Sequence, residues 1–353
     1  MIRSRLPRFL TASFACLSCF AVVAMADDHH SGRRKLADKH APAGIMGDHI
    51  HQPGQWMVEY KYMNMYMEDN RIGTQTVSDQ AAIDWGATSH PVTNRGATPT
   101  QMTMEMHMMH LMYGWTEDIS LYSMVMLPAL TMDHLRGPGN PAGSGTSFTT
   151  HNSGMGDLGL GALMRLYSDE RNDWLLNLGC SVPTGDLFRT SSAPTAGMMN
   201  QTLPYPMRLG SGTFNARPGV TYRHFFDLCS FGSQATADLP IGRNDRGYRL
   251  GEHYRLSNWF QCLMTDNWAL SIRDQHDWRN NISGQDPDAT DMLISTNVEN
   301  FRGGYWYSLA VGTQFTVGKN YFNAEIVPTI GQNLDGIQLE TDYSIIASWS
   351  LAF

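Results

Sequence analysis

The chain has 353 residues, of which 42% are hydrophobic and only 16% charged, and its formal net charge is -8. A mean hydropathy of -0.31 excludes a polytopic helical membrane protein, since each spanning helix needs about 20 mostly apolar residues. A transmembrane β-barrel remains compatible with this composition, because apolar and polar residues alternate along its strands.

The N-terminal residues 1–26 have the features of a secretory signal peptide. Arg3, Arg5 and Arg8 precede an apolar stretch over 9–26, which ends in the small-residue pattern Ala24-Met25-Ala26. We therefore expect Sec-type export and removal of residues 1–26, with an uncleaved anchor helix as the alternative. The mature chain then carries 22 basic and 33 acidic side chains, a balance that argues against a nucleic-acid partner.

Residues 27–53 are predicted to form a periplasmic leader that contains histidines. These histidines suit a harder ion or Cu(II), and they are His29, His30, His40, His49 and His51. Three of the five cysteines remain in the mature chain: Cys180, Cys229 and Cys262. Three cysteines are an odd number, and their spacing is not that of a metal site. We therefore expect each cysteine to act as a small apolar residue and not to belong to a disulfide scaffold.

From Trp56 onward the dominant hydrophobic period is two, which is typical of β-strands. The end of the chain shows this most clearly. Apolar residues there share one face, namely Tyr343, Ile345, Ala347, Trp349, Leu351 and Phe353, whereas the other face carries Ser344, Ser348 and Ser350. One face of such a strand suits hydrocarbon and the other suits water.

Twelve segments of this kind are predicted within residues 54–353, near 54–66, 101–115, 119–132, 155–167, 173–184, 209–223, 228–240, 248–264, 268–279, 301–317, 321–330 and 339–353. The connections between them alternate between long and short; the long ones are 67–100, 133–154, 185–208, 241–247, 280–300 and 331–338. This pattern predicts an all-β fold, a transmembrane antiparallel β-barrel of about twelve strands with short periplasmic turns and long extracellular loops.

Aromatic residues flank the predicted short turns: Tyr113 and Trp115 lie beside one turn, and Phe260 and Trp268 lie beside another. Rings collect where hydrocarbon meets the headgroups, so we expect the barrel to lie in the bacterial outer membrane, with outer-membrane lipid as a partner. A soluble β-sandwich is the alternative. A C-terminal strand that ends in Phe353 suggests the barrel-assembly machinery as a further partner.

Methionine is concentrated early in the chain, where 14 of the 23 lie between residues 46 and 132. Alternate residues of a strand share a face, so the segment 101–115 carries a stripe of methionine that includes one histidine. The thioether is a soft ligand that Cu(I) prefers, and imidazole is compatible with it. The candidate metal ligands are Met63, Met65, Met67, Met102, Met104, Met106, Met108, His110, Met112, His49 and His51, with a copper ion as the candidate cofactor.

Methionine is also a flexible apolar residue. Packing, or a greasy slide for apolar solutes, is therefore the alternative interpretation of the stripe. The sequence contains no phosphate loop, dinucleotide fingerprint or zinc helix motif, and no Ser and His at a spacing that supports a lipid hydrolase. We therefore expect no catalytic residues and no enzymatic activity.

Several short motifs resemble a family of outer-membrane transporter barrels named after the meta-pathway of phenol degradation. They are Gly154-Met155-Gly156-Asp157-Leu158, Val182-Pro183-Thr184-Gly185-Asp186, Tyr113-Gly114-Trp115-Thr116-Glu117-Asp118 and Gly210-Ser211-Gly212-Thr213. A Met-rich branch is more similar, through Gly47-Asp48-His49, the segment 102–108 and Met132-Asp133-His134. The resemblance spans most of residues 42–353. It implies a barrel that moves small molecules, aromatic compounds in the founding context.

The predicted function is passage of a small solute across the outer membrane. Either inward side chains or the leader would partly plug a narrow lumen, and selectivity would come from the lining side chains Glu59, Lys61, Asp157, Arg165, Arg217 and Arg223. Two alternatives stay open. One is a barrel that handles a soft metal, and the other is a structural or adhesive barrel whose long loops bind partners.

Overall fold

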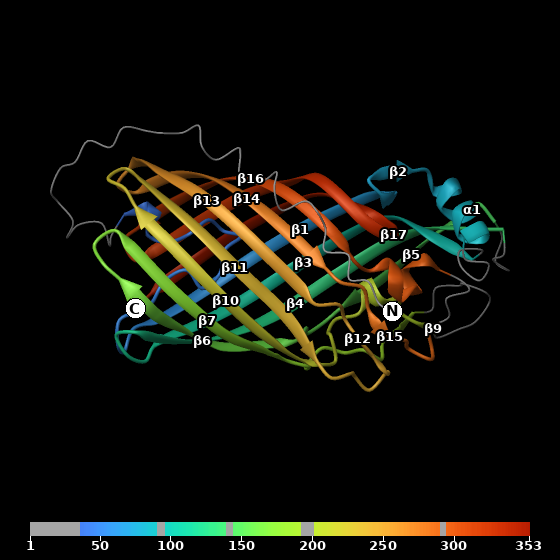
Figure 1. Ribbon diagram of the computed structural model, residues 1–353, viewed down its shortest axis with the longest axis horizontal. Helices are drawn as coiled ribbons and strands as arrows, with labels where there is room; N and C mark the ends of the chain where they lie inside the picture. Colours follow the sequence, from blue (N-terminus) through green and yellow to red (C-terminus); the bar gives the residue numbers. More distant parts are fainter. Residues whose placement is uncertain (1–35, 90–95, 139–143, 192–200, 290–293) are drawn as a thin grey trace, which may run out of the picture.

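The computed structural model describes residues 36–89, 96–138, 144–191, 201–289 and 294–353 (Figure 1). Eleven strands pair edge to edge in an antiparallel sheet, which closes because β17 pairs with both β16 and β1. They are β1 (Trp56–Gly73), β3 (Ala97–Gly114), β4 (Ile119–Arg136), β6 (Leu158–Ser168), β7 (Asn172–Val182), β10 (Phe214–Phe225), β11 (Cys229–Ile241), β13 (His253–Thr265), β14 (Trp268–Arg279), β16 (Gly304–Val317) and β17 (Asn320–Ala352). The predicted closed antiparallel barrel is thus confirmed.

The strand β17 is far longer than its neighbours, because it supplies two successive segments of the wall. Residues up to Leu334 pair with β16, whereas residues from Ile337 onward pair with β1. Between them Gly336 has a φ of +71°, a conformation that glycine adopts without strain and that lets the chain reverse its direction. The predicted loop over 331–338 is therefore wrong, because the structure assigns these residues to β17 and not to a long loop.

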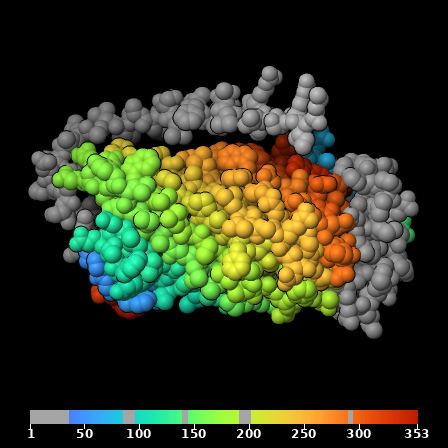
Figure 2. Space-filling model, turned by 60° about the horizontal axis from the view of Figure 1, so that its bottom comes forward, coloured from blue at the N-terminus to red at the C-terminus, as the bar shows by residue number. Residues whose placement is uncertain are grey.

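The two faces of the barrel wall differ as the alternation predicts. On β3, Met102 and Met112 are 4% and 5% exposed and face the interior, whereas Met109 and Leu111 are 45% and 42% exposed and face outward. The outward side chains are mostly apolar, and the strands pack into a continuous surface (Figure 2). Stacked or tilted rings lie on this exterior near the short turns, in the pairs Trp268 with Phe315, Trp174 with Tyr222 and Trp56 with Tyr113.

The two ends of the barrel are different. At the end that holds the C-terminus the strands are joined by short turns, and we call it the short-turn end (Figure 1). The opposite, long-loop end carries small elements: β2 (Gln75–Val77), α1 (Asp79–Ser89), β5 (Ser147–Ser153), β8 (Thr190–Ser191), β9 (Gln201–Thr202), η4 (Tyr205–Met207), β12 (Tyr248–Arg249), β15 (Ser283–Gly284), η5 (Ser295–Asn297) and η6 (Glu299–Phe301). Among the described residues, no helix combines the length and the apolar character needed to cross a membrane.

The cysteines correct one prediction. Cys229 of β11 and Cys262 of β13 stand opposite each other in register and form a disulfide, whereas Cys180 is free and exposed. The odd number of cysteines led to the wrong expectation, because one unpaired residue does not prevent the other two from pairing. Their contact depends on strand register, which the cysteine count does not contain.

Candidate functional site

The interior of the barrel is occupied at the short-turn end by residues 36–55, which we call the plug. The plug includes the short helix η3 (Ala37–Lys39). It enters beside the turn before β14, where the Ala37 amide donates to the Asp266 carbonyl at 3.0 Å, and it leaves beside β3, where the Gly54 amide donates to the Gly114 carbonyl at 2.9 Å. The described part of the predicted periplasmic leader therefore lies in the lumen.

One arginine of the wall holds the first part of the plug. The guanidinium of Arg223, on β10, donates to the carbonyl oxygens of Lys39 at 2.6 Å and Asp38 at 2.8 Å. The same group lies 3.4 Å from an Asp48 carboxylate oxygen, and Arg223 is only 2% exposed. A buried cation in these contacts is satisfied only while the plug stays in place.

The middle of the plug is held by several other wall strands. The Gly44 amide donates to Glu325, whose carboxylate also pairs with the buried Arg273 at 3.0 Å. A Cβ atom at Gly44 would lie 2.2 Å from the Arg273 guanidinium and 2.8 Å from the Glu325 carboxylate, so a larger residue here must displace this ion pair. Lumen side chains also donate to plug carbonyls: Lys61 to Ile45, Gln234 to Met46 and Gln261 to His40.

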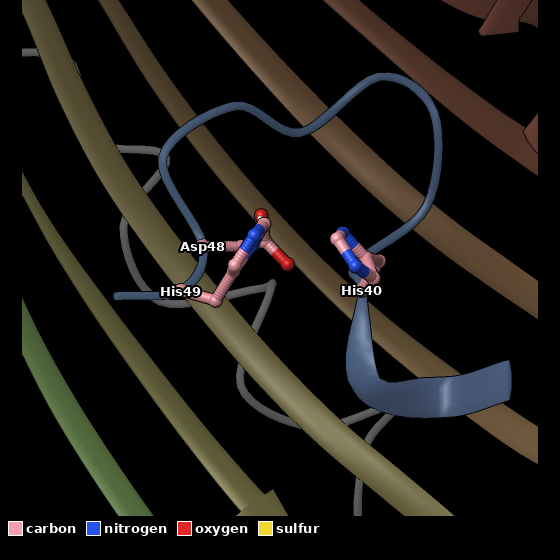
Figure 3. A group of neighbouring side chains, drawn as sticks. All are labelled: His40, Asp48 and His49. Carbon is pink, nitrogen blue, oxygen red and sulfur yellow. Dashed lines mark hydrogen bonds and ion pairs between the residues drawn. The ribbon is translucent and has the colours of Figure 1, made fainter. Parts of the chain in front are cut away.

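A cluster of imidazoles lies within the plug (Figure 3). His40 and His49 point toward each other with ring centroids 4.2 Å apart, and Asp48 lies beside them. Ligand atoms of His40, Asp48 and His49 all lie within 4.8 Å of one another, and the His51 ring is centred 4.8 Å from that of His49. The structure thus brings together His40, His49 and His51, three of the histidines that the sequence marks as ligands for a harder ion, and it adds Asp48.

Burial controls the charge of this cluster. Burial, reinforced by His49, holds the pKa of His40 well below its usual range and lowers the pKa of His51 to about 3. Burial alone would raise the pKa of the Asp48 carboxyl, but His49, Arg223 and His40 together hold that pKa well below its usual range. At neutral pH the cluster therefore presents neutral imidazoles of His40 and His51 beside a carboxylate.

Methionines cover the inner face of β1, β3 and β4. Those of β1 and β3 oppose each other in register, as Met63 with Met106, Met65 with Met104 and Met67 with Met102. The side chains of such pairs lie close enough to touch. The β4 strand continues the surface, since Met108 opposes Met126 and Met102 opposes Met132.

The predicted stripe on 101–115 thus faces the lumen, and it is part of a wider surface. We call it the methionine wall, and its members are Met57, Met63, Met65, Met67, Met102, Met104, Met106, Met108, Met112, Met124, Met126 and Met132. His110 lies on the same face, where its Nδ1 is 2.8 Å from a Glu59 carboxylate oxygen. Met63 also packs in a cluster with Ala43 of the plug.

The other predicted lumen residues divide into two groups. Glu59, Lys61 and Arg223 lie in the interior beside the plug, as described above. Arg217 pairs with Asp238 of the wall at 2.7 Å, Arg165 pairs with Asp118 of a short turn at 3.3 Å, and the buried Asp157 carboxylate accepts from Ser211. Of these residues, Lys61 and Arg223 donate hydrogen bonds to the plug.

Folded loops cover the long-loop end of the lumen. Leu203, Met207 and Leu209 pack against Met102 and Met132 of the methionine wall. Above them the buried Arg208 pairs with the fully buried Asp286 at 2.8 Å, and Arg246 approaches the same carboxylate at 3.5 Å. The sequence placed this region in loops and gave no signal for such packing.

Comparison with known proteins identifies the fold. No family model matches the chain, and no curated protein matches its sequence. The crystal structure of an outer membrane channel from Pseudomonas putida F1 is similar, with a TM-score of 0.59 and 13% identity over 88% of this chain and 99% of that one. At this identity the similarity shows a shared β-barrel fold and nothing about function.

Other barrels match more weakly. The KdgM porin has a TM-score of 0.40 and 7% identity, covering 84% of this chain and 99% of the porin. The toluene transporter TbuX of Ralstonia pickettii has a TM-score of 0.38 and 9% identity, covering 90% of this chain and 93% of the transporter. These scores are too low to support an inference about this chain.

Proposed function

We propose that this protein is an outer-membrane channel that passes small solutes and is closed by its own N-terminal segment. The observation that supports this most is the plug. Residues 36–55 enter and leave at one end and are held inside by polar groups of the wall, namely Arg223, Lys61, Gln234 and Gln261. A barrel that only stiffens a membrane needs no such removable closure.

The exterior of the barrel fits this location. Its outward side chains are mostly apolar and include rings at the short-turn end, as a bilayer and its interfaces require. A closed sheet leaves no unpaired backbone edge in hydrocarbon. We propose that the short-turn end faces the periplasm.

The number of membrane passes and the family are further parts of the proposal, and they depend on β17 and on the sequence motifs. Because β17 runs up beside β16 and down beside β1, we propose about twelve membrane passes, an even number that puts both wall termini on one side. We also propose membership of the family named after the meta-pathway of phenol degradation, based on the glycine-rich motifs. Aromatic compounds are then the first solutes to test.

Liposome swelling tests the channel proposal. Proteoliposomes that contain the full chain with Arg223→Ala, in which the plug has lost its arginine anchor, are diluted into solutions of sugars, amino acids and small aromatic acids of graded size. We expect swelling that falls steeply as solute size increases. A preparation that gives no swelling with any solute would favour the structural or adhesive alternative.

The methionine wall favours a second candidate function, the handling of a soft metal ion. Opposed thioethers, as at Met63 and Met106, offer two soft ligands from adjacent strands, and Cu(I) prefers such ligands. Cu(I) titration against a chromophoric chelator, under anaerobic reducing conditions, measures the affinity. Weaker binding in Met63→Leu with Met106→Leu, and unchanged binding in Met109→Leu, is the expected result.

A further inference from the structure

The plug contains a cluster of side chains of which only Asp48 contacts an anchoring residue of the wall. His40 follows η3, whereas Asp48 and His49 come later in the plug, and the fold of the plug brings the three together. His40 is 6% exposed, Asp48 7% and His51 4%. Burying several imidazoles against one another excludes water from groups that need polar partners.

Two nitrogen atoms of this group are without a partner. Among the described residues, no hydrogen bond is made to Nε2 of His49 or to Nε2 of His51, and both atoms are buried. An unsatisfied buried polar atom destabilises a folded protein. The open Nε2 of His51, whose ring lies beside that of His49, therefore suggests that a ligand completes the cluster.

The separations suit a metal ion. His49 Nδ1 and Asp48 Oδ1 are 2.9 Å apart, and the ligand atoms of all three residues lie within 4.8 Å. Two ligand atoms on one tetrahedral zinc ion are about 3.3 Å apart. Small rotations of the His40 and His49 side chains would close the difference.

The surroundings hold the carboxylate in position. Asp48 Oδ2 accepts from the Ala41 amide at 2.6 Å and lies 3.4 Å from the Arg223 guanidinium, which leaves Oδ1 directed at His49. The Arg223 charge opposes a cation at this site, and the Asp48 carboxylate offsets it. Imidazole and carboxylate together suit Zn²⁺ and Cu²⁺.

We propose that His40, Asp48 and His49 bind one Zn²⁺ or Cu²⁺ ion, which stabilises the plug inside the barrel. The ion takes the place of the proton between His49 Nδ1 and Asp48 Oδ1, and the neutral His49 ring then carries that proton on Nε2. His40 supplies the third ligand, and His51 stands next to the remaining position. Because the ion joins residues from two parts of the plug, its removal loosens the closed state.

This site is independent of the proposed channel activity, because binding is measured without any solute flux. Zn²⁺ and Cu²⁺ are titrated separately, by calorimetry, into the full mature chain in detergent. The starting protein carries His29→Ala and His30→Ala, since these leader histidines would bind metal themselves. We expect one ion per chain with a dissociation constant below about 10 μM, or about -7 kcal/mol.

Single substitutions identify the ligands. His40→Ala and His49→Ala should each weaken binding at least about tenfold, as loss of even an indirect support of a metal site does. The control is His107→Ala, because His107 faces outward on β3 beside Tyr60 and should leave the affinity unchanged. Equal affinities in all three variants, or no binding to the unsubstituted site, would overturn the proposal.

A second measurement does not depend on the folding of a variant. Co²⁺ added to the unsubstituted site should give a visible absorption spectrum of nitrogen and oxygen coordination, which excess Zn²⁺ abolishes. Protection of the plug from protease in detergent reports whether it stays docked in each metal-free variant. A cobalt spectrum dominated by thiolate or thioether charge transfer would place the ion elsewhere and refute the site.

Discussion

Replacing Arg223 by alanine should release the plug. The guanidinium makes two short hydrogen bonds to plug carbonyls, at 2.6 Å and 2.8 Å, and it is 2% exposed. Hydrogen bonds to a charged group are each worth about 1.5–3 kcal/mol, so Arg223→Ala should weaken docking by about 3–6 kcal/mol. Since about 1.4 kcal/mol is a factor of ten, the undocked population should rise at least about a hundredfold.

Single-channel recording in planar bilayers measures this change directly. We expect Arg223→Ala to raise the fraction of time spent in the open state. Arg217→Ala is a matched control, because Arg217 lies on the same strand and pairs with Asp238 of the wall at 2.7 Å, not with the plug. Identical recordings from the two variants would refute the idea that Arg223 holds the channel closed.

Three further predictions follow from the same contacts. Gly44→Val should displace the plug, because a Cβ atom at Gly44 meets the Arg273 guanidinium at 2.2 Å. We expect protease to cleave the plug faster in detergent, and an unchanged cleavage rate would contradict this prediction. Thiol labelling of the denatured, unreduced mature chain should modify Cys180 alone, whereas reduction should expose Cys229 and Cys262 as well; three reactive thiols before reduction would contradict the disulfide. Asp286→Ala should destabilise the long-loop end by about 3–5 kcal/mol, because it leaves Arg208 buried without its carboxylate partner. Hydrogen exchange of residues 203–209 should become faster, and an unchanged rate would show that the ion pair does not stabilise the loops over the lumen.

The sequence was sufficient to predict the wall strands, because alternation is a local signal. The predicted segment 268–279 coincides with β14, and the predicted segments near 173–184 and 228–240 differ from β7 and β11 by a few residues at most. Alternation also places Met102, Met108 and Met112 on one face, and the structure directs that face inward. The prediction failed at residues 331–338, where a tight turn replaces a loop.

The site was less accessible from the sequence, since it depends on contacts between distant residues. The plug has no hydrophobic period, and its anchors Arg223, Gln261 and Glu325 lie far along the chain. Histidine density pointed to His40, His49 and His51, but the approach of His40 to Asp48 results from the fold of the plug. The motif Gly47-Asp48-His49 was the one feature of the sequence that placed the Asp48 carboxylate beside a candidate histidine ligand.

Conductance of the barrel without its plug tests the central claim most directly. Residues 37–52 are deleted, and folding is verified by the migration of the unheated protein on a detergent gel. The full chain should give rare and brief current steps in a planar bilayer, whereas the deleted chain should give long, steady openings of uniform size. A folded barrel that carries no current after the deletion would contradict the proposal that this protein is a plugged channel.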